Sequence, residues 1–427
     1  MDITLLKKAA LHSVLLMVSV IFLSFITDIA PMLLYRKADD INMNKELIIA
    51  DRMVYSNYRK VGAATLSLSS DAPEDTADVL LSAAEAVRKQ IKADILQQLG
   101  NEFLIIAKPK GESVRLILEN IYIDKAIKLN ITGMADNNIS SKTILRIRGD
   151  ELFVGEPQYT EVVSLELDED DQTLKELIRK DYGRDLSHGI EIKTFKDTDS
   201  KLYKAQIDIN LDSVYECLVY EDDNNFYIDL KKPSELYDKI VVIDAGHGGK
   251  DGGAVSRNNR YCEKDLNLDI LLRLKQLLDK TDIKAYYTRT TDRTVYLRPR
   301  VELVNAVDAD YFISIHINSN KAPSPNGMEV LYYDNEFKGV KAEDLAALFS
   351  KELEKTVKLK QKGIVERRFE DLYILDHSLV PAVLLEIGYI SNEKDLAYLI
   401  QEENRQLIAN AIFNGILRAY NELPVKD

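Results

Sequence analysis

The sequence predicts an α/β domain at the C-terminal end of the chain, preceded by a second folded domain and a membrane helix. From residue 240 onwards, strand-like and helix-like segments alternate, which is typical of a mixed, mostly parallel sheet with helices on both faces. Residues 39–235 contain several stretches of period-two alternation, which favour an α+β or β-rich domain. An uncharged apolar run precedes both. We therefore divide the chain into residues 1–38, 39–235 and 236–427.

The N-terminal run indicates a membrane anchor. Lys7 and Lys8 precede residues 9–26, which contain no charged side chain and have the length of a transmembrane helix or a long signal peptide. The sequence around Ala30 is a poor cleavage site, and no cysteine lies beside it to carry a lipid. We therefore expect an uncleaved, single-pass anchor in the cell membrane. Its basic end should stay in the cytoplasm, which places the rest of the chain on the extracytoplasmic side.

Composition argues against several classes of function. The 427 residues include 70 acidic and 56 basic side chains, and the net charge of -14 disfavours binding to nucleic acid or another polyanion. The two cysteines, Cys217 and Cys262, are too few for a disulfide-rich scaffold or a zinc site built from four thiolates. They allow one disulfide in an exported protein, and the sequence leaves that pairing open.

Each predicted domain has its own series of elements. The first begins with a helical pattern over residues 75–99, ended by Gly100. Its strands are expected at residues 115–118, 126–131, 143–148, 205–211, 214–220 and 226–230. In the second domain, strands are expected at residues 240–243, 284–287, 311–315, 328–332 and 382–385. Helices are expected there at residues 264–278, 297–307, 341–356 and 402–420.

The first strand of the α/β domain runs into the loop Asp244-Ala245-Gly246-His247-Gly248-Gly249. The glycines allow unusual backbone dihedrals and close approach to a ligand, and the C-terminal end of a buried strand is where open α/β sheets place their sites. A nucleotide-binding fingerprint does not fit, because Asp251 stands where its last glycine would be. A flexible turn with an incidental histidine is the competing interpretation of this loop.

Three further polar residues stand at element ends in the same domain. Glu263 opens a predicted helix, where a carboxylate is also favourable for the helix dipole alone. His316 follows an apolar strand and could equally be a core histidine. Glu386 follows three apolar residues, where a carboxylate is costly unless it is paired. His377 lies in a loop, and it is either a surface residue or a group that supports the site.

Together these residues suit hydrolysis of an amide without a nucleophilic side chain. Two histidines and one glutamate leave the fourth position of a tetrahedral zinc ion open to water. The metal lowers the pKa of that water, and a further carboxylate can take its proton and deliver it to a leaving amine. A Ser-His-Asp triad has no G-x-S-x-G motif to support it.

Several motifs occur in order between residues 240 and 420. They are VVIDAGHGGKDGGAV, EKDLNL from Glu263, Thr288-Arg289 with Asp292, Leu297 with Arg300, FISIHINSN with Gly327-Met328-Glu329, and PAVLLEIGYISNEKD. This arrangement resembles the zinc-dependent N-acetylmuramoyl-L-alanine amidases. The resemblance implies that His247, Glu263 and His316 hold Zn²⁺ and that Glu386 is the catalytic carboxylate. It also implies hydrolysis of the amide between N-acetylmuramic acid and L-alanine in peptidoglycan, for cell-wall remodelling, separation or sporulation-related lysis.

Some features lie outside that core pattern. Ala245 replaces the proline of many members, and residues 318–327 and 333–344 are too short for the blocking helix of some relatives. We therefore expect an open site, or control by a regulatory protein partner or by the first domain. Asn318 is the candidate substrate contact. Residues 226–230 are similar to the closing strand of the β-sandwich modules that precede some cell-wall amidases, which makes residues 39–235 a candidate β-sandwich-like domain.

Two other functions remain open at this level. One is a zinc peptidase or deacylase of related fold, which product analysis on muropeptides would distinguish. The other is a peptidoglycan-binding regulator that does not cleave. An incomplete ligand set would favour the regulator, and the set in this sequence is complete.

Overall fold

The computed structural model describes residues 58–60, 83–141, 144–155, 189–197 and 200–423. The predicted membrane anchor at residues 9–26 lies outside these ranges. Within them, the helices are too short or too polar to cross a bilayer.

The described part of residues 58–231 forms two antiparallel sheets. One has the order β1-β6-β5-β2-β10-β9 and the other β3-β4-β8-β7. A single apolar cluster contains side chains of both sheets, among them Ile106 and Ile228 from the first and Leu129 and Ile207 from the second. The two sheets therefore pack face to face as a sandwich. The strands are β1 Tyr58–Lys60, β2 Glu102–Ala107, β3 Arg115–Ile121, β4 Ala126–Met134, β5 Ile144–Arg148, β6 Glu151–Gly155, β7 Ile190–Lys196, β8 Tyr203–Asn210, β9 Glu216–Glu221 and β10 Asn225–Lys231.

The prediction of one long helix over residues 75–99 is wrong within the described range. The chain forms two short helices instead, α3 (Ala83–Arg88) and α4 (Ala93–Leu96). Ile91 and Ile95 are both buried, in one cluster with Phe103 and Tyr227 of the six-stranded sheet. The break lets the chain turn so that both side chains reach that sheet.

The C-terminal domain contains the mixed sheet that the alternation predicts. Its order is β12-β11-β13-β18-β14-β17, and all neighbours are parallel except β14 and β18. The strands β14 and β17 therefore run opposite to the other four. The strands are β11 Ile240–Ala245, β12 Lys284–Tyr287, β13 Tyr311–Asn318, β14 Met328–Tyr333, β17 Gln361–Arg367 and β18 Ala382–Tyr389. The sequence analysis missed β17 and the short hairpin of β15 (Glu336–Phe337) and β16 (Val340–Lys341).

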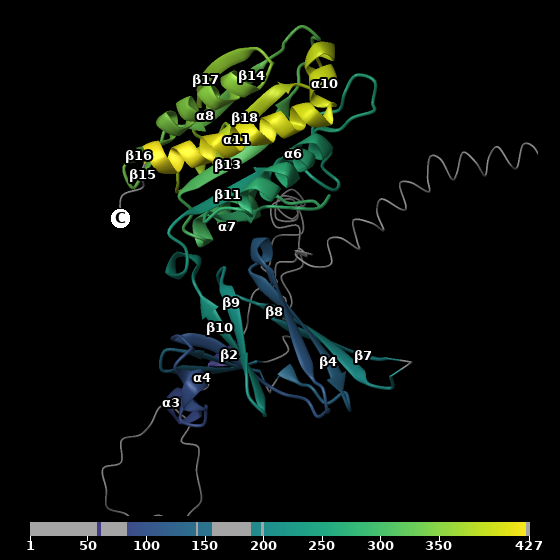
Figure 1. The fold of residues 1–427 in the computed structure, drawn as a ribbon, viewed down its shortest axis with the longest axis vertical. Helices are drawn as coiled ribbons and strands as arrows, with labels where there is room; N and C mark the ends of the chain where they lie inside the picture. Colours follow the sequence, from purple (N-terminus) through teal and green to yellow (C-terminus); the bar gives the residue numbers. More distant parts are fainter. Residues whose placement is uncertain (1–57, 61–82, 142–143, 156–188, 198–199, 424–427) are drawn as a thin grey trace, which may run out of the picture. The chain divides into compact units, whose positions relative to one another are not determined.

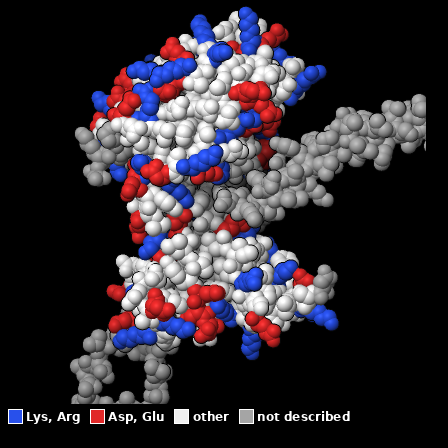
Figure 2. Space-filling view, in the orientation of Figure 1, with Lys and Arg blue, Asp and Glu red and all other residues white. Residues whose placement is uncertain are grey.

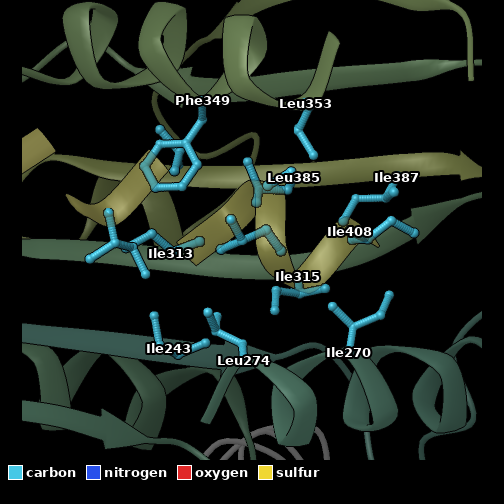
Figure 3. Close-up of a cluster of buried hydrophobic side chains, with 14 of the residues drawn as sticks. Ile243, Ile270, Leu274, Ile313, Ile315, Phe349, Leu353, Leu385, Ile387 and Ile408 are labelled. Atoms are coloured by element: carbon cyan, nitrogen blue, oxygen red, sulfur yellow. The ribbon is translucent and has the colours of Figure 1, made fainter. Parts of the chain in front are cut away.

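Helices cover both faces of this sheet, as predicted. On one face α6 (Glu263–Leu278), α8 (Ala342–Thr356) and α11 (Glu402–Glu422) lie side by side (Figure 1). Figure 3 shows their side chains, including Phe349 and Ile408, meeting strand residues such as Ile313 and Leu385. On the other face, α7 (Leu297–Ala306) and α9 (Tyr373–Asp376) belong to a second apolar cluster with the sheet. Helix α10 (Glu393–Leu399) follows β18, and its Leu399 lies in the cluster of the first face.

The outer surfaces of α8 and α11 are solvated. Figure 2 shows acidic and basic side chains interspersed on the face that it draws. Arg418 of α11 contacts Glu352 of α8 and also Glu422 one turn later, at 2.7 Å from Nε. Both thiols of the chain, Cys217 and Cys262, are unpaired.

Two strands continue further than their apolar runs suggest. β13 extends beyond Ile315 to Asn318, and β18 extends beyond Leu385 to Tyr389. Pairing continues because Ile317 and Ile387 are buried in the same core as the residues before them. His316 and Glu386 consequently lie inside strands and face each other in register.

Candidate metal centre

The three predicted ligands converge from three separate elements. His247 lies in the loop after β11, Glu263 is the first residue of α6, and His316 is on β13. Their ligand atoms all lie within 4.8 Å of one another. Nε2 of His247 is 3.2 Å from Oε2 of Glu263, and Nδ1 of His316 is 3.0 Å from Oε1 of the same carboxylate. Two imidazoles and one carboxylate form a donor set suited to Zn²⁺.

The charges of these residues fit a bound cation. Glu263 is almost fully buried, yet hydrogen bonds from His247 and His316 outweigh the effect of burial and hold its pKa well below the usual value. Burial alone would lower the pKa of His247, but Glu263 and Asp251 raise it to about 9. The buried carboxylate is thus compensated by a proton on an imidazole. A divalent cation held by His247, Glu263 and His316 would supply that compensation with both imidazoles neutral.

Asp251 orients the His247 ring. Its Oδ2 lies 2.8 Å from Nδ1 of His247, and its Oδ1 accepts a hydrogen bond from the N–H of Gly253 at 3.1 Å. With Nδ1 engaged, Nε2 is the nitrogen that faces Glu263. A carboxylate on the second nitrogen of a ligand histidine fixes the ring and its tautomer. The sequence analysis missed this role, because only the folded loop brings the two side chains together.

The ligand rings occupy space left by two glycines. A Cβ atom at Gly246 would lie 2.2 Å from Cε1 of His316. At Gly253, where φ is +63°, a Cβ would lie 2.6 Å from Cδ2 of His247 and 2.8 Å from Oε2 of Glu263. His247 itself has φ +63°, an unusual conformation for a residue with a side chain. The site therefore needs both glycines and a strained backbone at its first histidine.

Two buried arginines hold the carbonyl groups of the His247 loop. Arg289 donates from Nε to the carbonyl of Ala245 at 2.9 Å and from Nη2 to that of Gly246 at 3.0 Å. Arg300 donates to the carbonyl of Ala245 at 2.9 Å and to that of His247 at 2.9 Å. The two guanidinium groups together bind three consecutive carbonyls. They are the reason that this glycine-rich loop has one defined shape.

Asp244, at the end of β11, supplies the counter-charge to these arginines. Its carboxylate contacts Arg300 and accepts hydrogen bonds from Thr288 at 2.5 Å and Ser314 at 2.6 Å. Burial opposes its ionisation, but Arg300 and the two hydroxyl groups outweigh burial and lower the pKa of Asp244. The sequence analysis quoted Thr288, Arg289 and Arg300 as motif residues but assigned none of them a role.

Glu386 lies beside the three ligands on β18. Its Oε2 is buried, and no described residue donates a hydrogen bond to it. Burial, with the neighbouring carboxylates of Glu263 and Glu329, raises the pKa of Glu386 to about 7. A carboxylate with this pKa and an unoccupied oxygen can both accept and return a proton near neutral pH.

The other two candidates have different surroundings. Asn318 donates from Nδ2 to Glu329 at 3.0 Å, and its Oδ1 accepts from the N–H of Ser319 at 2.8 Å. Its contact with substrate stays a prediction. His377 stacks on Tyr373 at 4.0 Å between ring centroids and precedes the first residue of β18. Its side chain is exposed, which agrees with the interpretation of His377 as a surface residue.

Comparison with known proteins agrees with this geometry. Residues 241–418 match the family model described as N-acetylmuramoyl-L-alanine amidase. The germination-specific N-acetylmuramoyl-L-alanine amidase of Bacillus subtilis (strain 168) is 30% identical over 219 residues, which cover 48% of this chain and 88% of that protein. The chain belongs to this amidase family. All four of His247, Glu263, His316 and Glu386 fall within the matched residues, and the described sandwich precedes them.

Two further proteins of the same organism are similar to this chain. The uncharacterized protein YqiI is 36% identical over 184 residues, which cover 43% of this chain and 86% of that protein. The N-acetylmuramoyl-L-alanine amidase LytC is 32% identical over 191 residues, which cover 45% of this chain and 37% of LytC.

The glycine requirement can be tested with two neighbouring substitutions. Gly253→Ala places a methyl group against His247 and Glu263 and forces alanine into a left-handed conformation, so we expect Zn²⁺ affinity to fall by about tenfold or more. Gly252→Ala is the matched control, because a Cβ there meets none of the described atoms within 4 Å. Calorimetric titration of the metal-stripped variants measures both affinities. Equal Zn²⁺ binding by the two variants would contradict the packing argument.

The contribution of the buried Arg300 contacts can be tested by comparing substitutions of two arginines on α7. Arg300→Met leaves Asp244 as a buried carboxylate without its ion-pair partner, which should lower the free energy of unfolding by about 3–5 kcal/mol. Arg298→Met, two residues earlier on α7, removes a half-exposed ion pair with Glu302. We expect that change to cost no more than about 1 kcal/mol. Denaturant unfolding measures both, and similar small losses would show that the buried pair does not hold the loop.

Proposed function

We propose that this chain is a zinc-dependent amidase that hydrolyses the bond between N-acetylmuramic acid and L-alanine in peptidoglycan. The observation that carries the proposal is the His-Glu-His cluster beside a buried, unpaired carboxylate oxygen in a chain of the amidase family. His247, Glu263 and His316 would hold the metal. When bound, the metal supplies Lewis acidity, which polarises the scissile carbonyl and lowers the pKa of water.

Glu386 moves the proton in this proposal. Its Oε2 accepts a proton from the attacking water and then delivers it to the nitrogen of the leaving L-alanine, so one group acts first as base and then as acid. Its pKa of about 7 favours both steps near neutral pH. Arg289 and Arg300 keep the His247 loop in place while the reaction proceeds, because they bind its carbonyl groups.

Substitutions of Glu386 and Glu263 should have different effects on activity and on metal binding. Glu386→Gln keeps the shape of the side chain but cannot accept the proton, so activity on muropeptides should fall by about 10²–10⁴ while Zn²⁺ stays bound. Glu263→Ala removes a ligand, so Zn²⁺ occupancy and activity should fall together. Metal analysis and mass spectrometry of the digestion products measure the two effects.

The reverse pattern would show that the two roles are exchanged. If Glu386→Gln keeps full activity, another base carries the proton and the mechanism fails. If the products show cleavage within the peptide, the chain is a peptidase and the substrate assignment is wrong.

We further propose that residues 9–26 anchor the enzyme in the cell membrane, with the catalytic domain on the extracytoplasmic side. The support is the uncharged run with Lys7 and Lys8 before it. We expect N-terminal sequencing of the membrane fraction to find the uncleaved chain, and protease added to wall-stripped cells to degrade the catalytic domain. A soluble mature form that begins near residue 31, or a domain protected from protease, would reject the anchor or its orientation.

A further inference from the structure

A row of polar side chains crosses the sheet from the metal centre to the edge strand. His316 on β13 pairs with Glu386 on β18, and Glu386 pairs in turn with Glu329 on β14. Side chains at paired positions point to the same face of a sheet. Their strand neighbours, such as Ile317 and Val330, point to the opposite face and lie in the main core. The three polar residues therefore form one row on the face that carries α7 and α9.

This face has an apolar part and a polar part. Phe312, Leu331 and Leu384 lie in the apolar cluster with residues of α7 and α9. The polar row begins further along the same strands, towards the C-terminal end of β13. The row is thus the continuation of the metal centre across β18 and β14, and the proposed reaction takes place at one end of it.

Lys362 stands at the other end of the row. The pairing of β14 with β17 is irregular between Met328 and Val330, and Lys362 lies in the extra residues that β17 inserts there. Such a bulge changes the direction of a side chain relative to the regular ladder. Here Lys362 reaches over β14, where its Nζ lies 3.1 Å from Oε1 of Glu329.

The ammonium group of Lys362 is held in place on two sides. It donates to Glu329 and, at 2.9 Å, to the hydroxyl of Tyr389, and it lies 5.0 Å from the centroid of the Tyr389 ring. Glu329 also accepts from Asn318 and from Tyr389, at 3.0 and 3.1 Å. An ammonium has three N–H donors, and the contacts with described residues use two of them. About a third of the Lys362 side chain is exposed, so its third donor can meet a ligand.

We propose that Lys362, positioned by Glu329 and Tyr389, binds a carboxylate on the peptide arm of the substrate. This inference rests on the proposed function, because it takes the reacting amide to lie at the metal centre. The arm on the acyl side is a sugar with hydroxyl and acetamide groups, whereas the stem peptide carries carboxylates. Glu386 and Glu329 would repel such a group where the row crosses β18 and β14, and Lys362 is the cation at the end of the row.

The spacing of the strands agrees with a position near the start of the peptide. Nζ of Lys362 lies over β14, two strands from His316, and two strand spacings amount to about 10 Å. An extended chain covers that distance in about three residues. The α-carboxylate of the residue after L-alanine lies within that reach, and it is the group that we assign to Lys362.

The test compares two N-acetylmuramoyl peptides that differ in one group. In one, the α-carboxylate of the residue after L-alanine is free, and in the other it is amidated. A charge-assisted hydrogen bond should give the zinc-loaded wild-type protein about a tenfold higher kcat/KM for the free carboxylate, chiefly through KM. Lys362→Met should remove this preference by slowing cleavage of the first substrate and sparing the second. Lys362→Arg should retain most of the preference.

A matched control distinguishes the specific effect of Lys362 from the effect of removing any positive charge in this region. Lys358 is an exposed lysine shortly before β17, and Lys358→Met should leave the preference unchanged. The inference is overturned if the wild-type protein cleaves both substrates equally, if Lys362→Met slows both to the same extent, or if Lys358→Met also abolishes the preference. If the folded, zinc-loaded wild-type protein cleaves neither substrate, the proposed function fails, and the inference fails with it.

Discussion

The catalytic domain depends on one buried charge, the carboxylate of Asp244. It lies near the end of the inner strand β11 and is fully buried, and an unpaired carboxylate there would cost several kcal/mol. Arg300 compensates the charge, and its guanidinium also donates to the carbonyls of Ala245, His247 and Val295. The interaction that makes the buried charge tolerable therefore also fixes the loop that carries the first ligand. A substitution that removes the ion pair between Asp244 and Arg300 would therefore also disturb the loop that carries His247.

Glu263 links the remaining parts of the centre. Besides the two imidazoles, its carboxylate accepts backbone N–H groups from Ala254 at 2.9 Å and Ile317 at 3.1 Å. It thereby joins the loop before α6 to the strand that carries His316. Since the donors belong to rigid elements or to a loop bound by arginines, protein contacts by themselves hold the ligand atoms in position. Such preorganisation is what a catalytic metal site requires.

The sequence predicted the parts of this structure that leave a periodic or positional signal. Alternating apolar segments indicated the sheet and its helices, and polar residues at strand ends indicated the ligands. β17 left no such signal, because an edge strand with the sequence QKGIVER carries a glycine and charges where a central strand would be apolar. Without β17, Lys362 could not be connected with Glu329. The roles of Arg289 and Arg300 were equally hidden, because their partners are backbone carbonyls.

The contacts that hold the His247 loop bear on how folding and metal binding depend on each other. Small zinc domains generally fold only when the ion binds, so metal supply and folding are one process for them. Here guanidinium groups and backbone N–H groups also hold the ligands, so the shape of the His247 loop does not rest on a metal alone. If the proposed zinc ion is lost, these contacts remain, and the ion could be replaced without renewed folding. For an enzyme that acts on the cell wall, the metal content of the surroundings would then set the number of active molecules at any moment.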